Sequence, residues 1–402
     1  MRMNGKSDVK RNACMLGHII YDVDARVKKY VQFLLHRGFR VDVLCVSDAA
    51  NKTDDKPVES VSLVVVKELP RAQTSRFNYL LGTLVYLFKA AWKLSALQFK
   101  RRYTVVHVHN MPDFFVFAAI VPKLKGAVVI LDIHDRVPEL YARKFGTSTR
   151  SVPVRLLRFV ERVSCRFADH VIIANDVWRQ RLIDEGVIPA ENCTALPNFP
   201  DTNLFRARDP VSARQLGSPC KIVYHGSFTE FHGVDVAIKA MARLKEKLPS
   251  VQFLIYGGGP YEAELRRLIA ELGVEEIVKM CGSVSYLKVG EVLRGCDIAV
   301  VPKKAGVFSD DALSTKLFEY AAVGLPAVVS RTSAEMRYFS EGEVRYFNPG
   351  DAEDMARCIR ELYENPDLRH SLVVNAGHRL RHYGIEQIES GYTELVERLA
   401  SR

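Results

Sequence analysis

Long apolar runs are missing from this 402-residue sequence. No stretch approaches the roughly 18 to 20 consecutive apolar residues that a membrane-spanning helix needs, so the sequence predicts no segment that crosses a bilayer. The N-terminal stretch MRMNGKSDVKRNACMLGHII is basic, but Gly17 and His18 interrupt its short apolar run, and it lacks the hydrophobic region of a secretory signal. We expect a cytoplasmic protein, and peripheral binding to the inner face of the cell membrane is a further prediction.

Paired cysteines and common binding fingerprints are missing as well. The eight cysteines stand singly, with no CxxC pair and no metal-ligand spacing, which is typical of reduced thiols in a protein core. No GxGxxG motif follows the first predicted strand of either half, which disfavours a dinucleotide-dependent oxidoreductase. The basic residues are dispersed and match no nucleic-acid recognition motif, so we expect no nucleic-acid partner.

Positive charge is unevenly distributed along the chain. Residues 1–200 contain 31 Lys and Arg against 19 Asp and Glu, whereas the remaining residues contain 26 against 28. The net charge of +10 therefore arises from the N-terminal half. This asymmetry indicates either an anionic partner, such as a membrane surface or a phosphorylated acceptor, or simply a solvated basic surface.

Short β-rich apolar runs alternate with helical patterns from one end of the chain to the other, which predicts an α/β protein with parallel sheets. The predicted strands are 13–19, 39–46, 62–67, 103–109, 127–133, 170–175 and 193–198 in the first half, and 220–226, 251–257, 277–282, 297–302 and 326–330 in the second. The polar stretch 206–219 has the composition of a linker. We expect domains over residues 1–205 and 206–384, followed by a helix within 385–402 that packs back toward the first domain.

The segment 72–102 mixes aliphatic and aromatic residues with lysines and arginines. Such a mixture is typical of a helix that lies on an anionic membrane. It also fits a helix with one face on a sheet, and both descriptions can hold together.

The stretch DDALSTKLFEYAAVGLPAVVS, residues 310–330, has the most informative pattern. A strand ends before it, and a helix is predicted to begin at Ser314 or Thr315, either of whose hydroxyls is suited to cap it. Lys316 and Glu319 fall on one face of this helix, near its exposed start and opposite an apolar face. Because a helix N-terminus attracts anions and a carboxylate accepts hydrogen bonds from hydroxyls, this pattern indicates a nucleoside-diphosphate site.

Asp311 and Glu319 enclose seven residues, so this segment resembles the acidic E-x7-E motif of retaining GT-B glycosyltransferases, with Asp as the first acid. Further matches cover nearly the whole chain and together resemble glycosyltransferase family 4, particularly members that build bacterial surface polysaccharides on lipid carriers. The matching segments are DARVKKYVQFLLHRGFRVDVL (24–44), VVHVHNMPD (105–113), LDIHDRVPELY (131–141), PNFPDTNLF (197–205), HGSFTEFHGVDVAIKA (225–240), YGGGP (256–260), CDIAVVPKK (296–304) and ALSTKLFEY (312–320). The resemblance implies two facing Rossmann-like domains, the first for the acceptor and the second for the nucleotide sugar, with the donor site in the cleft between them.

The same resemblance implies roles for individual residues. Those implied in catalysis are His134, Asp311 and Lys316. Those implied in donor binding are Gly226, Ser227, His232, Val284, Leu313, Ser314 and Glu319. Those implied on the acceptor side are Asp24, Arg26, Asn110 and Asp135.

Within this set the resemblance separates the parts of the donor. Glu319 is expected to bind the ribose, and the loop of Val284 the base. Lys316, with the backbone N–H groups of Leu313 and Ser314, is expected to face the diphosphate, and Gly226 and Ser227 the distal phosphate. Asp311 and His134 are expected near the transferred sugar.

The implied reaction displaces a nucleoside diphosphate with retention at the anomeric carbon, and the leaving phosphate helps to take the acceptor's proton. The expected donor is a nucleotide sugar, with UDP as the favoured nucleotide. The expected acceptor is a glycan or a lipid-linked glycan, reached through the basic N-terminal domain at an anionic membrane surface. No metal and no other cofactor is expected, because cationic groups and helix N-termini replace Mg²⁺.

Two features depart from the family pattern. Many relatives carry Arg and Lys where this sequence has Ser227 and His232. Diphosphate stabilisation then rests on Lys316 and backbone N–H groups, with His232 or Lys303 as further cations. Asp311 is one methylene shorter than Glu, which shifts its carboxylate by roughly 1 to 1.5 Å. A non-catalytic nucleotide-sugar-binding partner protein and a GT-B sugar-nucleotide epimerase therefore remain alternatives.

Two weaker patterns favour structural roles. His107 and His109 lie two apart on a predicted strand and share a face, which also suits a metal pair, but no third ligand follows at a set spacing. The YGGGP segment follows a predicted strand, and Pro260 favours a tight turn over a phosphate cradle.

Overall fold

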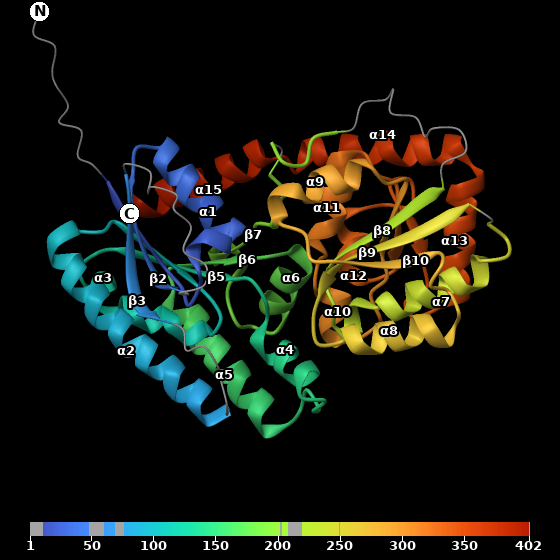
Figure 1. Cartoon of the computed structure of the whole chain (residues 1–402). Coiled ribbons are helices and arrows are strands. Elements are labelled where there is room, and N and C mark those ends of the chain that lie inside the picture. The colour runs from blue at the N-terminus through green and yellow to red at the C-terminus, as the bar shows by residue number, and fades with distance from the viewer. Residues whose placement is uncertain are drawn as a thin grey trace, which may run out of the picture. The chain divides into compact units, whose positions relative to one another are not determined.

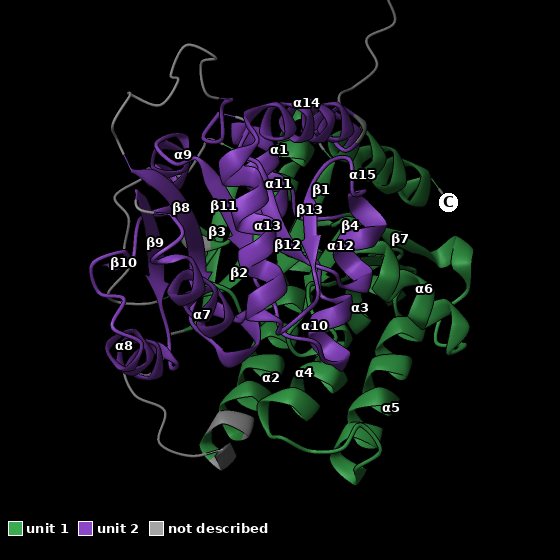
Figure 2. Ribbon diagram, turned by 90° about the vertical axis from the view of Figure 1, so that its right-hand side faces the viewer, with its two compact units in different colours: residues 1–196, 388–402 green, residues 197–387 purple. Residues whose placement is uncertain are grey.

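Two compact units make up the part of the chain that the structure describes (Figure 2). The computed structural model describes residues 11–47, 60–68, 76–201, 203–207, 219–248 and 250–401. The N-terminal unit comprises residues 1–196 with 388–402, and the C-terminal unit comprises residues 197–387. Among the described residues, no helix combines the length and the apolarity needed to cross a membrane.

The N-terminal unit is built on a seven-stranded parallel sheet with the order β3-β2-β1-β4-β5-β6-β7 (Figure 1). Its strands are β1 (Asn12–Leu16), β2 (Arg40–Ser47), β3 (Val61–Glu68), β4 (Val105–His109), β5 (Val128–Ile133), β6 (His170–Ile173) and β7 (Cys193–Ala195). The central strand β4 is buried along its whole length, as expected for a parallel sheet with helices on both faces.

Helices cover both faces of this sheet (Figure 1). The α-helices are α1 (Ala25–His36), α2 (Arg76–Arg101), α3 (Ile120–Leu124), α4 (Val137–Lys144), α5 (Val152–Phe167), α6 (Asp176–Asp184) and α15 (Ile385–Ala400). The 3-10 helices are η1 (Tyr21–Val23), η2 (Asp113–Ala119) and η3 (Ala190–Asn192). α1 and α15 pack together, with the rings of Tyr30 and Tyr392 4.4 Å apart. On the other face, α2, α3 and α5 all contact η2.

The C-terminal unit is built on a six-stranded parallel sheet with the order β10-β9-β8-β11-β12-β13. Its strands are β8 (Cys220–Ser227), β9 (Val251–Gly258), β10 (Val278–Gly282), β11 (Ile298–Val301), β12 (Ala327–Ser330) and β13 (Arg345–Phe347). Its helices are η4 (Glu230–His232), α7 (Val234–Leu244), α8 (Glu262–Glu271), α9 (Tyr286–Arg294), α10 (Val307–Asp311), α11 (Thr315–Val323), α12 (Ser333–Tyr338), α13 (Ala352–Glu364) and α14 (Pro366–His382).

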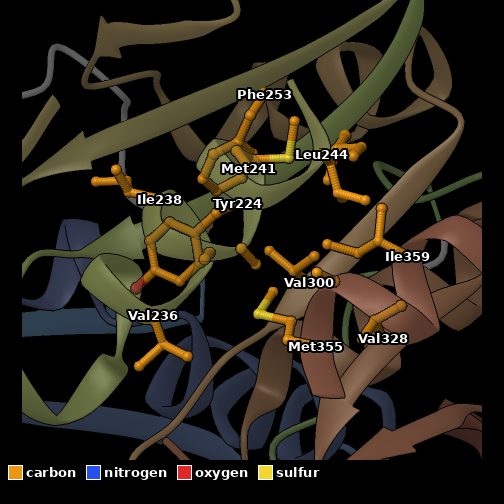
Figure 3. Close-up of a cluster of buried hydrophobic side chains, with 14 of the residues drawn as sticks. Tyr224, Val236, Ile238, Met241, Leu244, Phe253, Val300, Val328, Met355 and Ile359 are labelled. Carbon is orange, nitrogen blue, oxygen red and sulfur yellow. The ribbon is translucent and has the colours of Figure 1, made fainter. Parts of the chain in front are cut away.

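A cluster of buried apolar side chains joins this second sheet to α7, α8 and α13 (Figure 3). The labelled members are Tyr224, Val236, Ile238, Met241, Leu244, Phe253, Val300, Val328, Met355 and Ile359. Each large apolar side chain that folding buries stabilises a protein by about 1.5–3 kcal/mol. The cluster therefore stabilises the positions of β8, β9 and β11. The helix α11 contacts α9 and α14.

Both sheets reverse their strand order at one place. In the N-terminal sheet this switch point lies between β1 and β4, and in the C-terminal sheet between β8 and β11. Ligands of open α/β sheets bind outside the carboxyl ends of the strands at such a point. The topology therefore predicts ligand sites at the segments that follow β1, β4, β8 and β11.

The predicted fold class, two Rossmann-like α/β domains, is confirmed. Every predicted strand is present, with small shifts of its ends. The strand β13 was missed, because its sequence RYF is too short to show a periodic pattern. The cysteines are free thiols as predicted, and all are buried except Cys281.

The division between the units falls after Leu196, earlier than the expected boundary at residue 206. The ring of Phe199 lies 4.5 Å from that of Phe318, and the ring of Phe205 lies 5.5 Å from that of Tyr286. These contacts attach the segment that follows Leu196 to α11 and α9, so the expected boundary was too late. Residues 208–218 of the predicted linker lie outside the described residues.

Candidate functional site

A pocket of about 320 Å³ lies at the carboxyl end of β8, beside the switch point of the C-terminal sheet. The ends of β8 and β9 and the segment after β10 line it, through His225, Gly226, Ser227, Tyr256, Gly257, Gly258, Ser283, Val284, Tyr286 and Val289. Its volume falls within the range of about 300–1,000 Å³ that is typical of small-molecule sites. Three of the residues implied in donor binding, Gly226, Ser227 and Val284, thus line one pocket.

Lys316 of α11 lies across Gly226. Gly226 has a φ of +133°, and a Cβ atom there would come within 2.3 Å of Cε of Lys316, so only glycine fits. The ammonium lies 5.5 Å from the centre of the Tyr224 ring. Burial, reinforced by the charge of Lys303 and opposed by that of Glu319, lowers the pKa of Lys316 to about 8. A desolvated ammonium beside a pocket is stabilised by a bound anion.

Glu319 is buried, whereas the helical pattern predicted an exposed position. Only 8% of its surface is accessible. Its Oε2 lies 2.6 Å from Nε2 of His225, whose Nδ1 lies 3.1 Å from the hydroxyl of Tyr320. Because His225 lies near the end of β8 and also lines the pocket, this contact holds the Glu319 carboxylate in one orientation close to the glycine turn.

A carboxylate of the protein already occupies the N-terminus of α11. The backbone N–H of Ser314 donates to Oε1 of Glu335 at 3.0 Å, and the side chain of Ser314 itself does not cap this helix. Glu335 is fully buried and forms an ion pair of 2.8 Å with Nζ of Lys303, which also donates to two backbone carbonyls. The prediction that the hydroxyl of Ser314 or Thr315 caps this helix was therefore wrong. In this structure the Ser314 N–H and the Lys303 ammonium, both expected at a diphosphate, contact Glu335.

The other predicted donor residues lie in loops near the pocket or beside α10. Nδ1 of His232 lies 3.0 Å from the hydroxyl of Thr229 and 3.3 Å from that of Ser227, so Ser227 and His232 are neighbours in the turn after β8. Asp311 ends α10 and is buried, with 1% of its surface accessible. Leu313 is half-buried between α10 and α11.

A buried carboxylate organises the candidate residues of the N-terminal unit. Asp132 of β5 accepts two hydrogen bonds from Arg26, from Nε at 2.9 Å and from Nη2 at 2.7 Å. Its Oδ2 also lies 3.0 Å from Nδ1 of His109 and 2.8 Å from Nε2 of His134. Burial alone would raise the pKa of Asp132, but Arg26 and His134 hold it well below its usual range.

Arg26, which is expected on the acceptor side, takes part in this buried network. Its guanidinium is buried, and Nη1 donates to the carbonyl of Leu196 at 2.8 Å in addition to the bonds with Asp132. The side chain thereby links α1 to β5 and to the segment after β7. Three of the five guanidinium N–H groups thus donate to acceptors of the protein itself.

Two of the other predicted acceptor residues, Asn110 and Asp135, lie beside His134. Asn110 is buried, donates to the carbonyl of Asp135 at 2.9 Å and accepts from the N–H of His134 at 2.9 Å. Asp24 caps α1 by accepting from a backbone N–H of its first turn. His134 and Asp135 are half-buried at the carboxyl end of β5, where burial raises the pKa of Asp135 to about 6.

The pair His107 and His109 does gain a third neighbour in the structure. Potential ligand atoms of His107, His109 and Asp132 lie within 4.8 Å of one another. Nδ1 of His107 lies 3.0 Å from the hydroxyl of Tyr392, and the guanidinium of Arg26 contacts both oxygens of Asp132. Because that positive charge opposes a cation beside it, a structural hydrogen-bond network remains the favoured interpretation.

Both halves of the chain match models of glycosyltransferase domains. Residues 23–198 match a glycosyl transferase 4-like domain, and residues 209–379 match glycosyl transferases group 1. The fold and the site thus define a two-domain protein of the GT-B class. More specifically, the chain carries a glycosyl transferase 4-like domain followed by a glycosyl transferases group 1 domain.

Individual relatives agree with this class. The putative colanic acid biosynthesis glycosyltransferase WcaL of Salmonella typhimurium is 28% identical over 199 residues, which cover 49% of this chain and 48% of WcaL. The amylovoran biosynthesis glycosyltransferase AmsK of Erwinia amylovora is 30% identical over 190 residues, covering 46% and 45% of the two chains. The chain thus spans about half the length of these relatives. The crystal structure of Anabaena HepE in complex with UDP has the same fold, with a TM-score of 0.72 at 18% identity over 96% of this chain and 100% of that chain.

Three residues of the two sites were not found by sequence reasoning. His225 was overlooked, although it stands directly before the glycine turn at the end of β8. Asp132 was overlooked as well, although it lies two positions from His134 on the same strand segment. Glu335 gave no local signal, because it contacts Ser314 and Lys303 only through the folded structure.

The buried Arg26 and Asp132 pair predicts a large stability effect. Replacing Arg26 with Met leaves the buried Asp132 carboxylate without its permanent cation, which should lower the free energy of unfolding by about 3–5 kcal/mol. Urea unfolding followed by tryptophan fluorescence measures this, because Trp92 and Trp178 both belong to the N-terminal unit.

The matched control is Arg37→Met. Arg37 forms an exposed pair of 3.9 Å with Glu397, and its loss should lower the free energy of unfolding by less than about 1 kcal/mol. Equal effects of the two substitutions would contradict the structural role of Arg26.

Proposed function

We propose that this protein is a retaining glycosyltransferase that moves a sugar from a UDP-linked donor to a glycan or lipid-linked glycan in surface-polysaccharide synthesis. The pocket at the end of β8 carries the proposal, because an ammonium, a glycine turn and a carboxylate converge beside it in Lys316, Gly226 and Glu319. An ammonium suits a diphosphate, and a carboxylate suits the hydroxyls of a ribose. The names of WcaL and AmsK as polysaccharide glycosyltransferases, and the UDP bound to HepE, support the same function.

In this proposal each part of the donor has its own protein groups. The diphosphate lies against the Lys316 ammonium and the backbone of Gly226 and Ser227. The ribose hydroxyls donate to Glu319, whose orientation His225 maintains. The base lies at Val284, in the same pocket.

The transferred sugar is the part of the donor on which the remaining catalytic residues are proposed to act. His134 is proposed to contact it, with its imidazole held by Asp132 and its backbone by Asn110. Asp311 is proposed to bind the sugar hydroxyls. Since only 1% of Asp311 is accessible, this role requires its carboxylate to become exposed when the donor binds.

The proposed chemistry needs no nucleophile from the protein. The bond between the anomeric carbon and the diphosphate oxygen breaks, and the acceptor oxygen bonds to that carbon on the same face. The leaving phosphate oxygen takes the acceptor's proton. The protein aligns the reactants and stabilises the charge of the leaving group through Lys316 and backbone N–H groups, so we propose a metal-independent reaction.

We further propose that the acceptor is presented at an anionic membrane. The excess positive charge of residues 1–200 supports this, since lipid-linked glycans reside in bilayers whose surface is often anionic. The cytoplasmic, peripheral location predicted from the sequence follows as part of the same proposal.

The neutral side chains at Ser227 and His232 favour one alternative, a partner protein that binds a nucleotide sugar without turnover. A GT-B epimerase is a second alternative. Product analysis separates the three. A retaining transferase should yield an acceptor-linked sugar with the anomeric configuration of the donor, detected by NMR. A changed nucleotide sugar without acceptor would instead identify an epimerase, and a bound but unreacted donor in every acceptor mixture would identify a partner protein.

UDP should raise the thermal unfolding midpoint. A ligand at 100 times its Kd stabilises the native state by about 2.7 kcal/mol, so UDP is expected to shift the midpoint visibly and more than ADP or GDP. Glu319→Gln should weaken UDP binding roughly ten- to hundredfold, because it removes a charged acceptor of hydrogen bonds. The control Glu271→Gln alters an exposed carboxylate of α8 and should leave the shift unchanged. A UDP shift that survives in Glu319→Gln would exclude the ribose role.

The affinity for UDP should decline as the pH rises above 8. The free Lys316 ammonium has a pKa of about 8, and a bound diphosphate raises that pKa, so the affinity is highest below pH 8 and falls up to about tenfold per pH unit above it. Isothermal titration calorimetry at several pH values between neutral and alkaline measures this decline in UDP affinity. Lys316→Arg retains its charge and should abolish the pH dependence, whereas Lys316→Met should bind UDP weakly at every pH. An unchanged pH profile in both variants would contradict the proposed contact.

A further inference from the structure

The outward side of α2 is apolar, although its inward side already supplies a core stripe. The inward stripe contains Tyr86, Ala90 and Leu94, all buried. On the outward side, Leu81, Phe88, Trp92 and Phe99 are exposed by 51%, 71%, 72% and 64%. Their spacing of three or four residues, or a multiple of it, places them along one side of the helix. Soluble proteins rarely leave such a continuous apolar stripe uncovered.

The outward side of α5 repeats this pattern and adds positive charge. Val152, Leu156 and Phe159 are exposed by 75%, 61% and 64%. Beside them stand the exposed arginines Arg155, Arg162 and Arg166. The single acidic residue of α5, Glu161, is buried and pairs with Arg136, so it does not offset this charge. α2 contains no acidic residue and ends in Lys100 and Arg101.

The short helix α3 joins these two surfaces. Nζ of Lys125, at its end, lies 5.4 Å from the centre of the Phe99 ring of α2. Nζ of Lys123 lies 5.4 Å from the centre of the Phe167 ring at the end of α5. Both views of the N-terminal unit show α2, α3 and α5 on the same side of its sheet (Figures 1 and 2). We call the outward surfaces of these three helices together the α2–α3–α5 face.

The mixture of side chains on this face selects the kind of partner. Exposed aromatic and aliphatic residues interleaved with Lys and Arg fit the boundary between headgroups and acyl chains, where the apolar groups insert and the cations reach phosphates. A second copy of the chain fits less well, because the same basic side chains would then face one another. Negative charge is missing from the exposed parts of α2 and α5, which suits a surface rich in anionic lipid.

We propose that the α2–α3–α5 face docks the protein on an anionic lipid bilayer, with Phe88, Trp92 and Phe159 inserted at the interface. This proposal deepens the proposed function and rests on it only for the lipid-linked acceptor. Docking itself requires neither a donor nor an acceptor, so it is measured separately from nucleotide binding.

Tryptophan fluorescence tests insertion directly. The chain has two tryptophans, of which Trp92 is 72% exposed and Trp178 only 2%. Vesicles of phosphatidylglycerol and phosphatidylcholine should shift the emission of the full-length protein to shorter wavelength and protect Trp92 from a soluble quencher. Trp92→Phe should still bind the vesicles but lose this shift, because the buried Trp178 does not sense the lipid.

Vesicle sedimentation measures the affinity. The double variant Phe88→Ser with Phe159→Ser should bind phosphatidylglycerol vesicles at least about tenfold more weakly, because it removes two large apolar groups from the interface. Arg155→Gln with Arg162→Gln should weaken binding severalfold at low salt and reduce its salt dependence. The control Leu272→Ser with Val374→Ser removes two exposed apolar residues of the C-terminal unit and should bind as the unaltered protein does.

Three results would overturn docking. The unaltered protein fails to bind phosphatidylglycerol vesicles, or the Phe88 and Phe159 variant binds as well as the control, or analytical ultracentrifugation shows a dimer that this variant dissociates. The last outcome would make the face an interface between two copies. UDP-induced stabilisation of the same variants shows that they are folded and tests the donor site independently, so a failure of docking is distinct from a failure of the proposed function.

Discussion

The position of the Lys316 ammonium over Gly226 is the constraint on which the candidate donor site depends. Gly226 leaves room for the lysine and has a φ of +133° that residues with a side chain rarely adopt, and α11 begins close to this end of β8. Burial of the ammonium lowers its pKa to about 8. The pocket therefore has a cation that is held in place before any ligand arrives, which is the property that makes electrostatic stabilisation effective.

The buried pair of Glu335 and Lys303 determines what remains available beside Lys316. Glu335 accepts a hydrogen bond from the N–H of Ser314 and neutralises Lys303, so neither of these two groups adds net positive charge for a ligand. The turn after β8 adds only Ser227 and the titratable His232. Under the proposed function, a diphosphate would thus depend on a single cationic side chain, Lys316, more strongly than in a site with several cations. This explains why the protonation of Lys316 should control the affinity.

The fold followed from the sequence, whereas part of each site did not. Apolar runs of strand length are local signals, and they predicted both parallel sheets. Helical periodicity showed which face of α11 Glu319 occupies. It did not show that His225 of strand β8 would contact the Glu319 carboxylate. Arg26 and Asp132 are 106 positions apart, and no local pattern relates them. The neighbours of a charged side chain are set by the tertiary fold, which a single sequence does not display.

The exposed apolar residues of α2 and α5 need an explanation other than folding. Tyr86, Ala90 and Leu94 already anchor α2 to its sheet, so Phe88 and Trp92 add nothing to that core. Left in water, such side chains favour association, and polar residues would serve an isolated helix surface better. Their presence together with basic residues, on the half of the chain that bears the net positive charge, is consistent with selection for a surface that is covered in use. A bilayer would satisfy both the apolar and the charged members of that surface at once.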